Sequence, residues 1–225
     1  MKPYIVATTK PWNIASFFKR TQDLPGQWHL VKNPQDLTVE TVKKIAPRYI
    51  FFPHWSWFVP KNIRTEAECV CFHASDVPYG RGGSPIQNLI ARGHKDTVLS
   101  ALKMVDELDA GPIYLKSYLD LSGRAQDIFE RIAELIWDSI TTIITTEPTP
   151  QPQAGNITTF TRRTPEQSKL PDTGSIQSLF DHIRMLDADS YPPAYIEYGD
   201  FVIEFSHGKN QGNSLSAQVI IRPKA

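Results

Sequence analysis

Short apolar runs alternate with helical stretches along the first third of the chain, and this alternation constrains the fold more than any other feature. Residues 4–8, 49–52 and 69–72 are apolar runs with the length of buried strands. Apolar spacing predicts helices over residues 12–20 and 36–45, between the first two runs. Strands that alternate with helices are typical of a parallel sheet in an α/β fold.

One long helix and a proline-rich segment follow further along the chain. Residues 124–145 carry an uninterrupted apolar stripe that predicts a helix. Residues 97–105 are ambiguous, because their propensity allows a helix while their alternation also fits a strand. The segment EPTPQPQ, residues 147–153, contains alternating prolines that cannot continue a helix and favour an extended spacer.

This spacer divides the chain. We therefore expect a core over residues 1–146, a linker over 147–154 and a small subdomain over 155–225. The subdomain has the pattern of a helix over residues 175–186 and of an aromatic hairpin over 194–205, which makes it a C-terminal α+β appendage.

Charge and cysteine content restrict the class of protein. Lys and Arg together number 24, as do Asp and Glu, whereas a protein that binds RNA usually carries a basic excess. Cys69 and Cys71 are the only cysteines, and we expect their side chains to point to opposite faces of a strand and to stay reduced. Their spacing matches no zinc motif, and no apolar stretch reaches the roughly 18 residues of a membrane helix. We expect a cytoplasmic protein with no metal, no nucleic-acid partner and no membrane contact.

The stretch CFHASDVPYGRGGSP, residues 71–85, holds the strongest candidate for a functional site. His73 ends an expected strand, and open α/β sheets bind ligands at the carboxyl ends of their strands. Asp109, in the turn LDAGP, could meet His73 at the same sheet edge, where a carboxylate would orient the imidazole and stabilise its protonated form. From the residues alone, His73 could equally cap a turn and Asp109 could be an ordinary turn residue.

These motifs together resemble the signature of the 10-formyltetrahydrofolate-dependent formyltransferases. The matching segments are HASDVPYGRGGSPIQ and LDAGP, and the resemblance covers residues 49–145 well and 1–48 loosely. It implies a Rossmann-like, mostly parallel sheet, the formyltransferase fold, and makes residues 97–105 a strand against their propensity. It also implies 10-formyltetrahydrofolate as the co-substrate of an N-formyltransferase.

The family's catalytic trio is asparagine, histidine and aspartate. The resemblance carries the histidine to His73 and the aspartate to Asp109, but Cys71 stands where the asparagine should be. That amide donates a hydrogen bond to the developing oxyanion, and a thiol is a weak donor. Four alternatives stay open: His73 acts with a backbone N–H or water, Asn62 or Asn88 replaces the amide, the protein is a weakened or non-catalytic relative, or Cys71 is a nucleophile.

The resemblance also implies binding residues. In the family, the loop before the histidine strand contacts the pterin, and Asp109 lies beside the cofactor as well. Here that loop carries Trp55, Trp57, Phe58 and Val59, a platform for a flat ring. The same aromatic side chains could instead belong to a core or an interface.

Three residues of the turn after His73 are candidates for binding the acceptor substrate. Tyr79 could shape its pocket, and Arg81 and Gly82 could contact a sugar or a phosphate. The alternative for Arg81 is a surface salt bridge.

The acceptor is expected to be a nucleotide-linked amino sugar. Neutral charge and a short C-terminal part disfavour the tRNA enzymes of the family, and residues 180–186 and 191–196 resemble the tail of sugar N-formyltransferases. The resemblance implies formyl transfer to a UDP-linked 4-amino-4,6-dideoxy sugar of the pseudaminic-acid branch, in lipopolysaccharide or glycan biosynthesis. The alternatives are a methionyl-tRNA-type formyltransferase, a formyltetrahydrofolate hydrolase and a non-catalytic binding relative. The aromatic tail could serve the nucleotide or a partner subunit in a homodimer.

Overall fold

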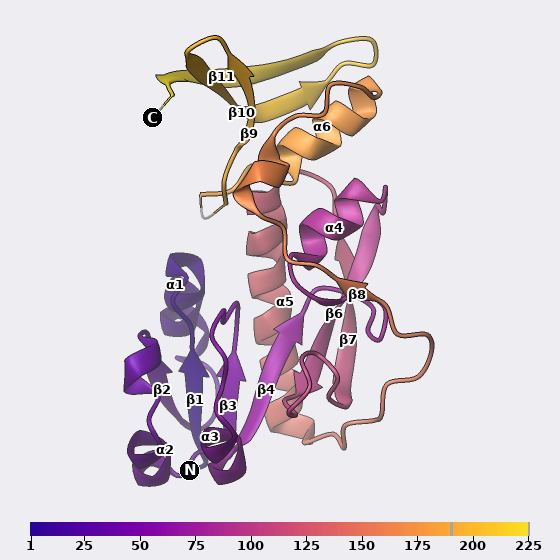
Figure 1. The fold of residues 1–225 in the computed structure, drawn as a ribbon. Helices are drawn as coiled ribbons and strands as arrows, with labels where there is room; N and C mark the ends of the chain where they lie inside the picture. Colours follow the sequence, from indigo (N-terminus) through magenta and orange to yellow (C-terminus); the bar gives the residue numbers. More distant parts are fainter. Residues whose placement is uncertain (190, 225) are drawn as a thin grey trace. The chain divides into compact units, whose positions relative to one another are not determined.

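A computed structural model describes residues 1–189 and 191–224 (Figure 1). In chain order, its helices and strands are β1 (Pro3–Ala7), α1 (Pro11–Arg20), β2 (Gln27–Val31), α2 (Val39–Ile45), β3 (Tyr49–Phe52), α3 (Lys61–Glu66), β4 (Glu68–His73), β5 (Arg81–Gly82), α4 (Pro85–Ala91), β6 (Asp96–Lys103), β7 (Ile113–Asp120), α5 (Ala125–Thr146), β8 (Thr159–Phe160), α6 (Ile176–Arg184), β9 (Ala194–Tyr198), β10 (Phe201–Asn210) and β11 (Leu215–Pro223). The chain divides into two compact units. The first consists of Met1–Arg81, Val98–Leu119 and Glu130–Thr159, and the second of Gly82–Thr97, Asp120–Phe129 and Phe160–Ala225. The domain boundaries expected from the sequence stay a prediction.

A mixed, mostly parallel sheet forms the frame of the first unit. Its strand order is β2-β1-β3-β4-β6-β7. The pairs β1–β2, β1–β3 and β3–β4 are parallel, and β4 pairs with β6 in the antiparallel sense. The predicted α/β fold with a mostly parallel sheet is confirmed. The chain first steps from β1 to β2 and then crosses to β3, so the strand order reverses at β1.

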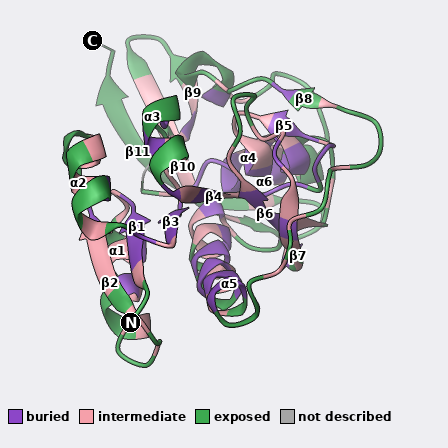
Figure 2. Cartoon of the chain, turned by 90° about the horizontal axis from the view of Figure 1, so that it is seen from below, coloured by how far each residue is buried: buried purple, intermediate pink, exposed green. Residues whose placement is uncertain are grey.

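The two faces of this sheet have different aromatic content. On one face, Tyr4, Trp28 and Phe51 lie against one another, and Trp28 also contacts the fully buried Trp137 of α5. The other face carries a mainly aliphatic cluster of ten buried residues: Ile5, Ala7, Val31, Val42, Ile50, Phe52, Val59, Ile63, Ala67 and Cys69. Figure 2 shows how closely burial follows α5 and the central strands.

The expectation about the two cysteines was wrong in its geometry. Cys69 belongs to the aliphatic cluster and Cys71 packs against the same cluster, so both side chains lie on one face of β4. Side chains two positions apart on a strand point the same way, and the opposite face belongs to the residue between them. Both cysteines are free thiols.

Residues 97–105 form most of β6, as the family resemblance implied and helix propensity did not. Leu99, Ala101 and Leu102 are almost completely buried. Pairing with β4 and burial in a sheet outweigh a weak intrinsic preference. A smaller difference concerns α2, which begins at Val39 rather than at residue 36, because the Thr38 hydroxyl accepts a hydrogen bond from the Thr41 N–H and caps the helix there.

The second unit contains a three-stranded antiparallel sheet in the order β11-β10-β9. Its hairpin turns at Gly199, which has a φ of +54°, so the predicted hairpin and C-terminal α+β part are confirmed. Helix α6 packs on β10 so closely that a Cβ added at Gly208 would lie 3.2 Å from Ile183. The sequence patterns did not reveal β11, nor α3 and β7 in the first unit. No helix among the described residues is long and apolar enough to cross a membrane.

Candidate active site

The structure brings His73 and Asp109 together. His73 is the last residue of β4, and its side chain is only 8% exposed. Its Nδ1 lies 3.4 Å from Oδ2 of Asp109, and its Nε2 lies 2.7 Å from the carbonyl oxygen of Gly80. The hydroxyl of Ser75 donates to the same Gly80 oxygen at 3.0 Å, and the hydroxyl of Ser100 donates to the Ser75 carbonyl at 2.8 Å. The imidazole is therefore held from both sides before any ligand binds.

The surroundings of His73 present one oxygen atom to each ring nitrogen. The Gly80 carbonyl oxygen is an acceptor and never a donor, and the same is true of the Asp109 carboxylate when it is ionised. A ring that carries a proton on each nitrogen satisfies both oxygens, whereas a neutral ring leaves one nitrogen lone pair against an oxygen. A positively charged imidazole of this kind stabilises negative charge that develops beside it.

The turn that carries Asp109 is tightly constrained. Asp109 itself has a φ of +52°, a left-handed backbone conformation that residues other than glycine adopt infrequently. Two residues later, a Cβ added at Gly111 would lie 1.7 Å from the carbonyl oxygen of Lys103, so only glycine fits there. Lys103 in turn donates its N–H to the Pro112 carbonyl at 2.9 Å. The turn is thus fixed against the end of β6.

Cys71 offers a weak donor and a poor nucleophile. Its side chain is partly buried, and burial, with a smaller contribution from the Asp109 charge, raises the pKa of the thiol. A neutral thiol is not the reactive form, which disfavours the nucleophile alternative. The amide of Asn88 donates to the carbonyls of Gly83, Ser84 and Thr161, all in the second unit.

Asn62 lies exposed near the start of α3. Asn88 is already committed to backbone carbonyls. The amide of Asn88 is therefore occupied without a ligand.

The aromatic loop, residues 53–60, follows β3 and is only partly covered. The Trp55 ring lies 5.8 Å from Phe52 and 5.1 Å from Trp57, centroid to centroid. Trp57 is 47% and Phe58 77% exposed, whereas Val59 belongs to the buried aliphatic cluster. The buried Nε1 of Trp55 has no hydrogen-bond partner among the described residues. The loop therefore combines open aromatic surface with an unused donor, and Val59 anchors it to the core.

Arg81 is neither an exposed salt bridge nor an open anion site. The residue is 9% exposed. Its Nη1 donates to Oε1 of Glu107 at 3.0 Å, and its Nε and Nη2 donate to Oε1 of Gln153 at 3.1 and 2.8 Å. Tyr79 is half-buried within the same turn, and Gly82 has a φ of +101° and is part of the second unit.

Gln153 is the residue near this pair that sequence reasoning missed. Its Nε2 donates to the carbonyls of Asp109 and Gly111 at 2.7 and 2.8 Å. It comes from the proline-rich segment expected to be a spacer. Its partners are backbone atoms and one arginine, far away in the sequence, so no local pattern could have indicated it.

A second polar cluster lies where the strand order reverses, at the carboxyl ends of β1 and β3. Asn13 is fully buried, and its Nδ2 donates to Nδ1 of His54 at 2.9 Å and to Oγ1 of Thr8 at 3.2 Å. Burial lowers the pKa of His54 to about 4. Neither His54 nor Asn13 was among the site residues predicted from the sequence.

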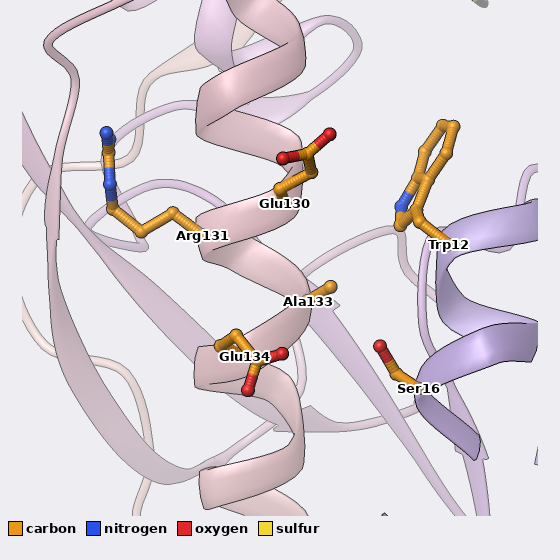
Figure 3. A pocket seen from close by; sticks show the side chains of 6 residues that line it. All are labelled: Trp12, Ser16, Glu130, Arg131, Ala133 and Glu134. Atoms are coloured by element: carbon orange, nitrogen blue, oxygen red, sulfur yellow. The ribbon is translucent and has the colours of Figure 1, made fainter. Parts of the chain in front are cut away.

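A hollow in the first unit, between α1 and α5, has a different lining (Figure 3). Trp12 and Ser16 come from α1, and Glu130, Ala133 and Glu134 lie on the side of α5 that faces them. None of the site residues predicted from the sequence is part of this lining. Over the described residues, no group of three or more His, Cys, Asp or Glu side chains could hold a metal ion.

The chain is similar to methionyl-tRNA formyltransferases. The family model of the methionyl-tRNA formyltransferase C-terminal domain matches residues 165–222. The methionyl-tRNA formyltransferase of Streptococcus pyogenes serotype M6 is 31% identical over 159 residues, which are 68% of this chain and 51% of the relative. The chain thus spans about half the length of the curated relatives that it matches.

Two solved structures extend the comparison. A 4-N formyltransferase from Francisella tularensis shares the fold, with a TM-score of 0.65 over 96% of each chain, at 14% identity. A methionyl-tRNA formyltransferase from Clostridium thermocellum is 44% identical, and the alignment covers 100% of both chains with a TM-score of 0.95. On this full-length similarity, the chain belongs to the family of 10-formyltetrahydrofolate-dependent formyltransferases.

Proposed function

We propose that the protein transfers a formyl group from 10-formyltetrahydrofolate to a primary amine. The single observation that carries this proposal is the contact of 3.4 Å between His73 and Asp109 at the carboxyl end of β4. The sequence around both residues resembles the family signature, and the chain belongs to that family. The His73 side chain is also buried and that of Asp109 only 12% exposed, and both are fixed, as a proton-handling pair should be.

The loop residues fit the co-substrate. A folate contains flat rings, and the exposed faces of Trp57 and Phe58 offer apolar surface for one. The unpartnered Nε1–H of Trp55 offers a donor to a ring nitrogen or carbonyl. Bound 10-formyltetrahydrofolate would supply the electrophilic formyl carbon.

The chain's own residues would then handle charge and protons. The attacking amine must be neutral, and its attack places negative charge on the formyl oxygen. His73, charged and held by Asp109, stabilises that oxygen. Asp109 keeps the ring oriented and can accept the proton that the amine loses as the new C–N bond forms. The bond between the formyl carbon and N10 of the co-substrate would then break, and tetrahydrofolate would leave with that proton on N10.

The amino group of methionyl-tRNA is the acceptor that we favour. The support is that the relatives at 31% and 44% identity and the model matching residues 165–222 are all named for that enzyme. The nucleotide-sugar acceptor expected from the sequence has weaker support, because the 4-N formyltransferase shares only the fold. The balanced charge of the chain, 24 basic and 24 acidic residues, leads us to expect modest, salt-sensitive tRNA binding.

The test is a comparison of acceptors. The protein is incubated with 10-formyltetrahydrofolate and either methionyl-tRNA or a panel of UDP- and dTDP-linked 4-amino sugars, and formylated products are identified by mass. We expect formyl-methionyl-tRNA. A formylated sugar alone would overturn the acceptor, and formate released without any amine would indicate a hydrolase instead.

A matched pair of variants connects the activity to the site. His73→Asn should abolish formyl transfer while leaving the protein folded. His29→Asn, on β2 of the same sheet, should keep the wild-type rate. Near-normal turnover of the His73 variant would contradict the assignment.

A further inference from the structure

The carboxamide of Gln153 bridges two separate turns of the first unit. Its Nε2 donates to the carbonyls of Asp109 and Gly111, and its Oε1 accepts from the guanidinium of Arg81. The oxygen and the nitrogen of this amide are therefore both hydrogen-bonded. Its orientation is fixed by chemistry, because exchanging the oxygen and nitrogen would place N–H groups against the guanidinium and an oxygen against two carbonyls.

The two turns that Gln153 connects are the ones that hold His73. One carries Asp109, whose carboxylate lies 3.4 Å from Nδ1 of His73. The other carries Gly80, directly before Arg81, whose carbonyl lies 2.7 Å from Nε2. Both oxygen partners of the imidazole therefore sit on segments bound by the same carboxamide.

Backbone contacts support this connection. The carbonyl of Thr158 accepts from the N–H groups of Gly80 and Arg81 at 2.9 and 3.0 Å, and the Thr158 N–H donates to the Pro78 carbonyl at 3.1 Å. The strained, left-handed backbone of Asp109 has to be held in place by its surroundings. Gln153 holds the carbonyl of Asp109 directly, through its Nε2 donor.

We propose that Gln153 is a positioning residue for formyl transfer, which fixes the Asp109 turn and the Gly80–Arg81 turn around His73. This inference rests on the proposed function. The proline-rich segment is then more than a spacer, because it delivers the side chain that sets the geometry of the pair. Loss of that geometry should slow the chemical step, since small displacements of catalytic groups cost up to about a hundredfold in rate.

Two substitutions separate the contacts of Gln153. Gln153→Ala removes all of them. Gln153→Glu keeps an acceptor for Arg81 but places a carboxylate oxygen against the carbonyls of Asp109 and Gly111. Gln151→Ala is the matched control, because the exposed Gln151 side chain reaches only the carbonyl of Thr149.

The experiment measures kcat and KM for formyl transfer and the ¹⁵N NMR shifts of the His73 ring in the full chain. We expect both Gln153 variants to lose about ten- to a hundredfold in kcat with KM changed less than about threefold, and to move the ring shifts. Gln151→Ala should match the wild type in both. Circular dichroism verifies that each variant is folded.

Three results would overturn the inference: wild-type kcat and ring shifts in Gln153→Ala, full rescue by Gln153→Glu, or an equal defect in Gln151→Ala. Rescue by the glutamate would show that only the contact with Arg81 matters. If the wild-type protein forms no formylated product, the proposed function fails, and the ring shifts still decide whether Gln153 positions His73.

Discussion

His73 ends β4 and the aromatic loop follows β3, a parallel neighbour of β4 in the same sheet, yet the His73–Asp109 pair and the loop are built in opposite ways. The His73 side chain is 8% exposed, and each of its ring nitrogens already faces a protein oxygen. In the loop, Phe58 is 77% exposed and the buried Nε1 of Trp55 has no hydrogen-bond partner among the described residues. The ring nitrogens of His73 thus have partners without a ligand, whereas the aromatic loop keeps exposed rings and an unpartnered donor.

This difference separates two tasks. Polar groups that act on a transition state work best when they are fixed in advance, because no energy is then spent on reorganising them. An apolar ring platform gains its stabilisation only when a ligand covers it and removes water. We call the His73–Asp109 pair with its surroundings the closed region and the aromatic loop, residues 53–60, the open loop. Changes at the closed region should therefore appear mainly in kcat, and changes at the open loop mainly in the binding of 10-formyltetrahydrofolate.

After the loss of activity expected from His73→Asn, the largest effect is expected from Asp109→Asn. An amide at this position removes the negative charge that holds His73 and the acceptor for a proton. We expect kcat to fall about 10²- to 10⁴-fold, with a much smaller change in the Kd of 10-formyltetrahydrofolate. Single-turnover kinetics and a fluorescence titration measure the two quantities. Equal losses in kcat and in the affinity for 10-formyltetrahydrofolate would show that the two regions do not have separate tasks.

Cys71→Asn tests the one position at which the closed region departs from its family. The family's amide is a stronger donor than a neutral thiol, so restoring it should raise kcat, by about tenfold if it reaches the developing oxyanion. Cys69→Ala, on the same strand and face, should leave kcat unchanged. A large fall in the Cys71 variant would mean that the thiol has a role of its own.

A smaller effect is expected at the open loop from Phe58→Ala. The loss of one exposed ring face should weaken 10-formyltetrahydrofolate binding about fivefold, since an aromatic contact contributes about 0.5–1.5 kcal/mol. The kcat value at saturation should stay within about twofold. Phe18→Ala is the control, because Phe18 is similarly exposed, at 58%, on α1. Unchanged binding in the Phe58 variant would remove the loop from the folate site.

The closed and open regions also differed in how far the sequence could predict them. His73 could be placed at a strand end because 69–72 is a short apolar run, and the position of Asp109 followed from a glycine turn. Gln153 could not be found, because its partners are an arginine and two backbone carbonyls 42 and 44 residues away. Such contacts produce no periodic pattern in the sequence. The strand β11 was missed because it is exposed along most of its length and the apolar residues 219–221 interrupt the alternation of its first part. Patterns report local burial, whereas long-range polar contacts depend on the completed fold.

The smallest effect concerns His54, which lies in the loop but is held like the closed region. Burial lowers its pKa to about 4, and the Asn13 amide donates to its Nδ1, so the neutral ring is the folded form. Because the unfolded chain takes up a proton near pH 6.5, the free energy of unfolding should fall as the pH drops from 6.5 towards 4. The His54 contribution should be at most about 1 kcal/mol between pH 6.5 and 5.5. Urea denaturation at these two pH values measures it.

His54→Asn is the matched variant for that measurement, because asparagine tolerates the φ of +50° at this position. It should remove this part of the pH dependence, while His29→Asn should keep it. An unchanged pH dependence in the His54 variant would show that His54 titrates alike in the folded and unfolded chain. The loop would then lack a buried, neutral imidazole, and the contrast with the His73–Asp109 pair would rest on exposure alone.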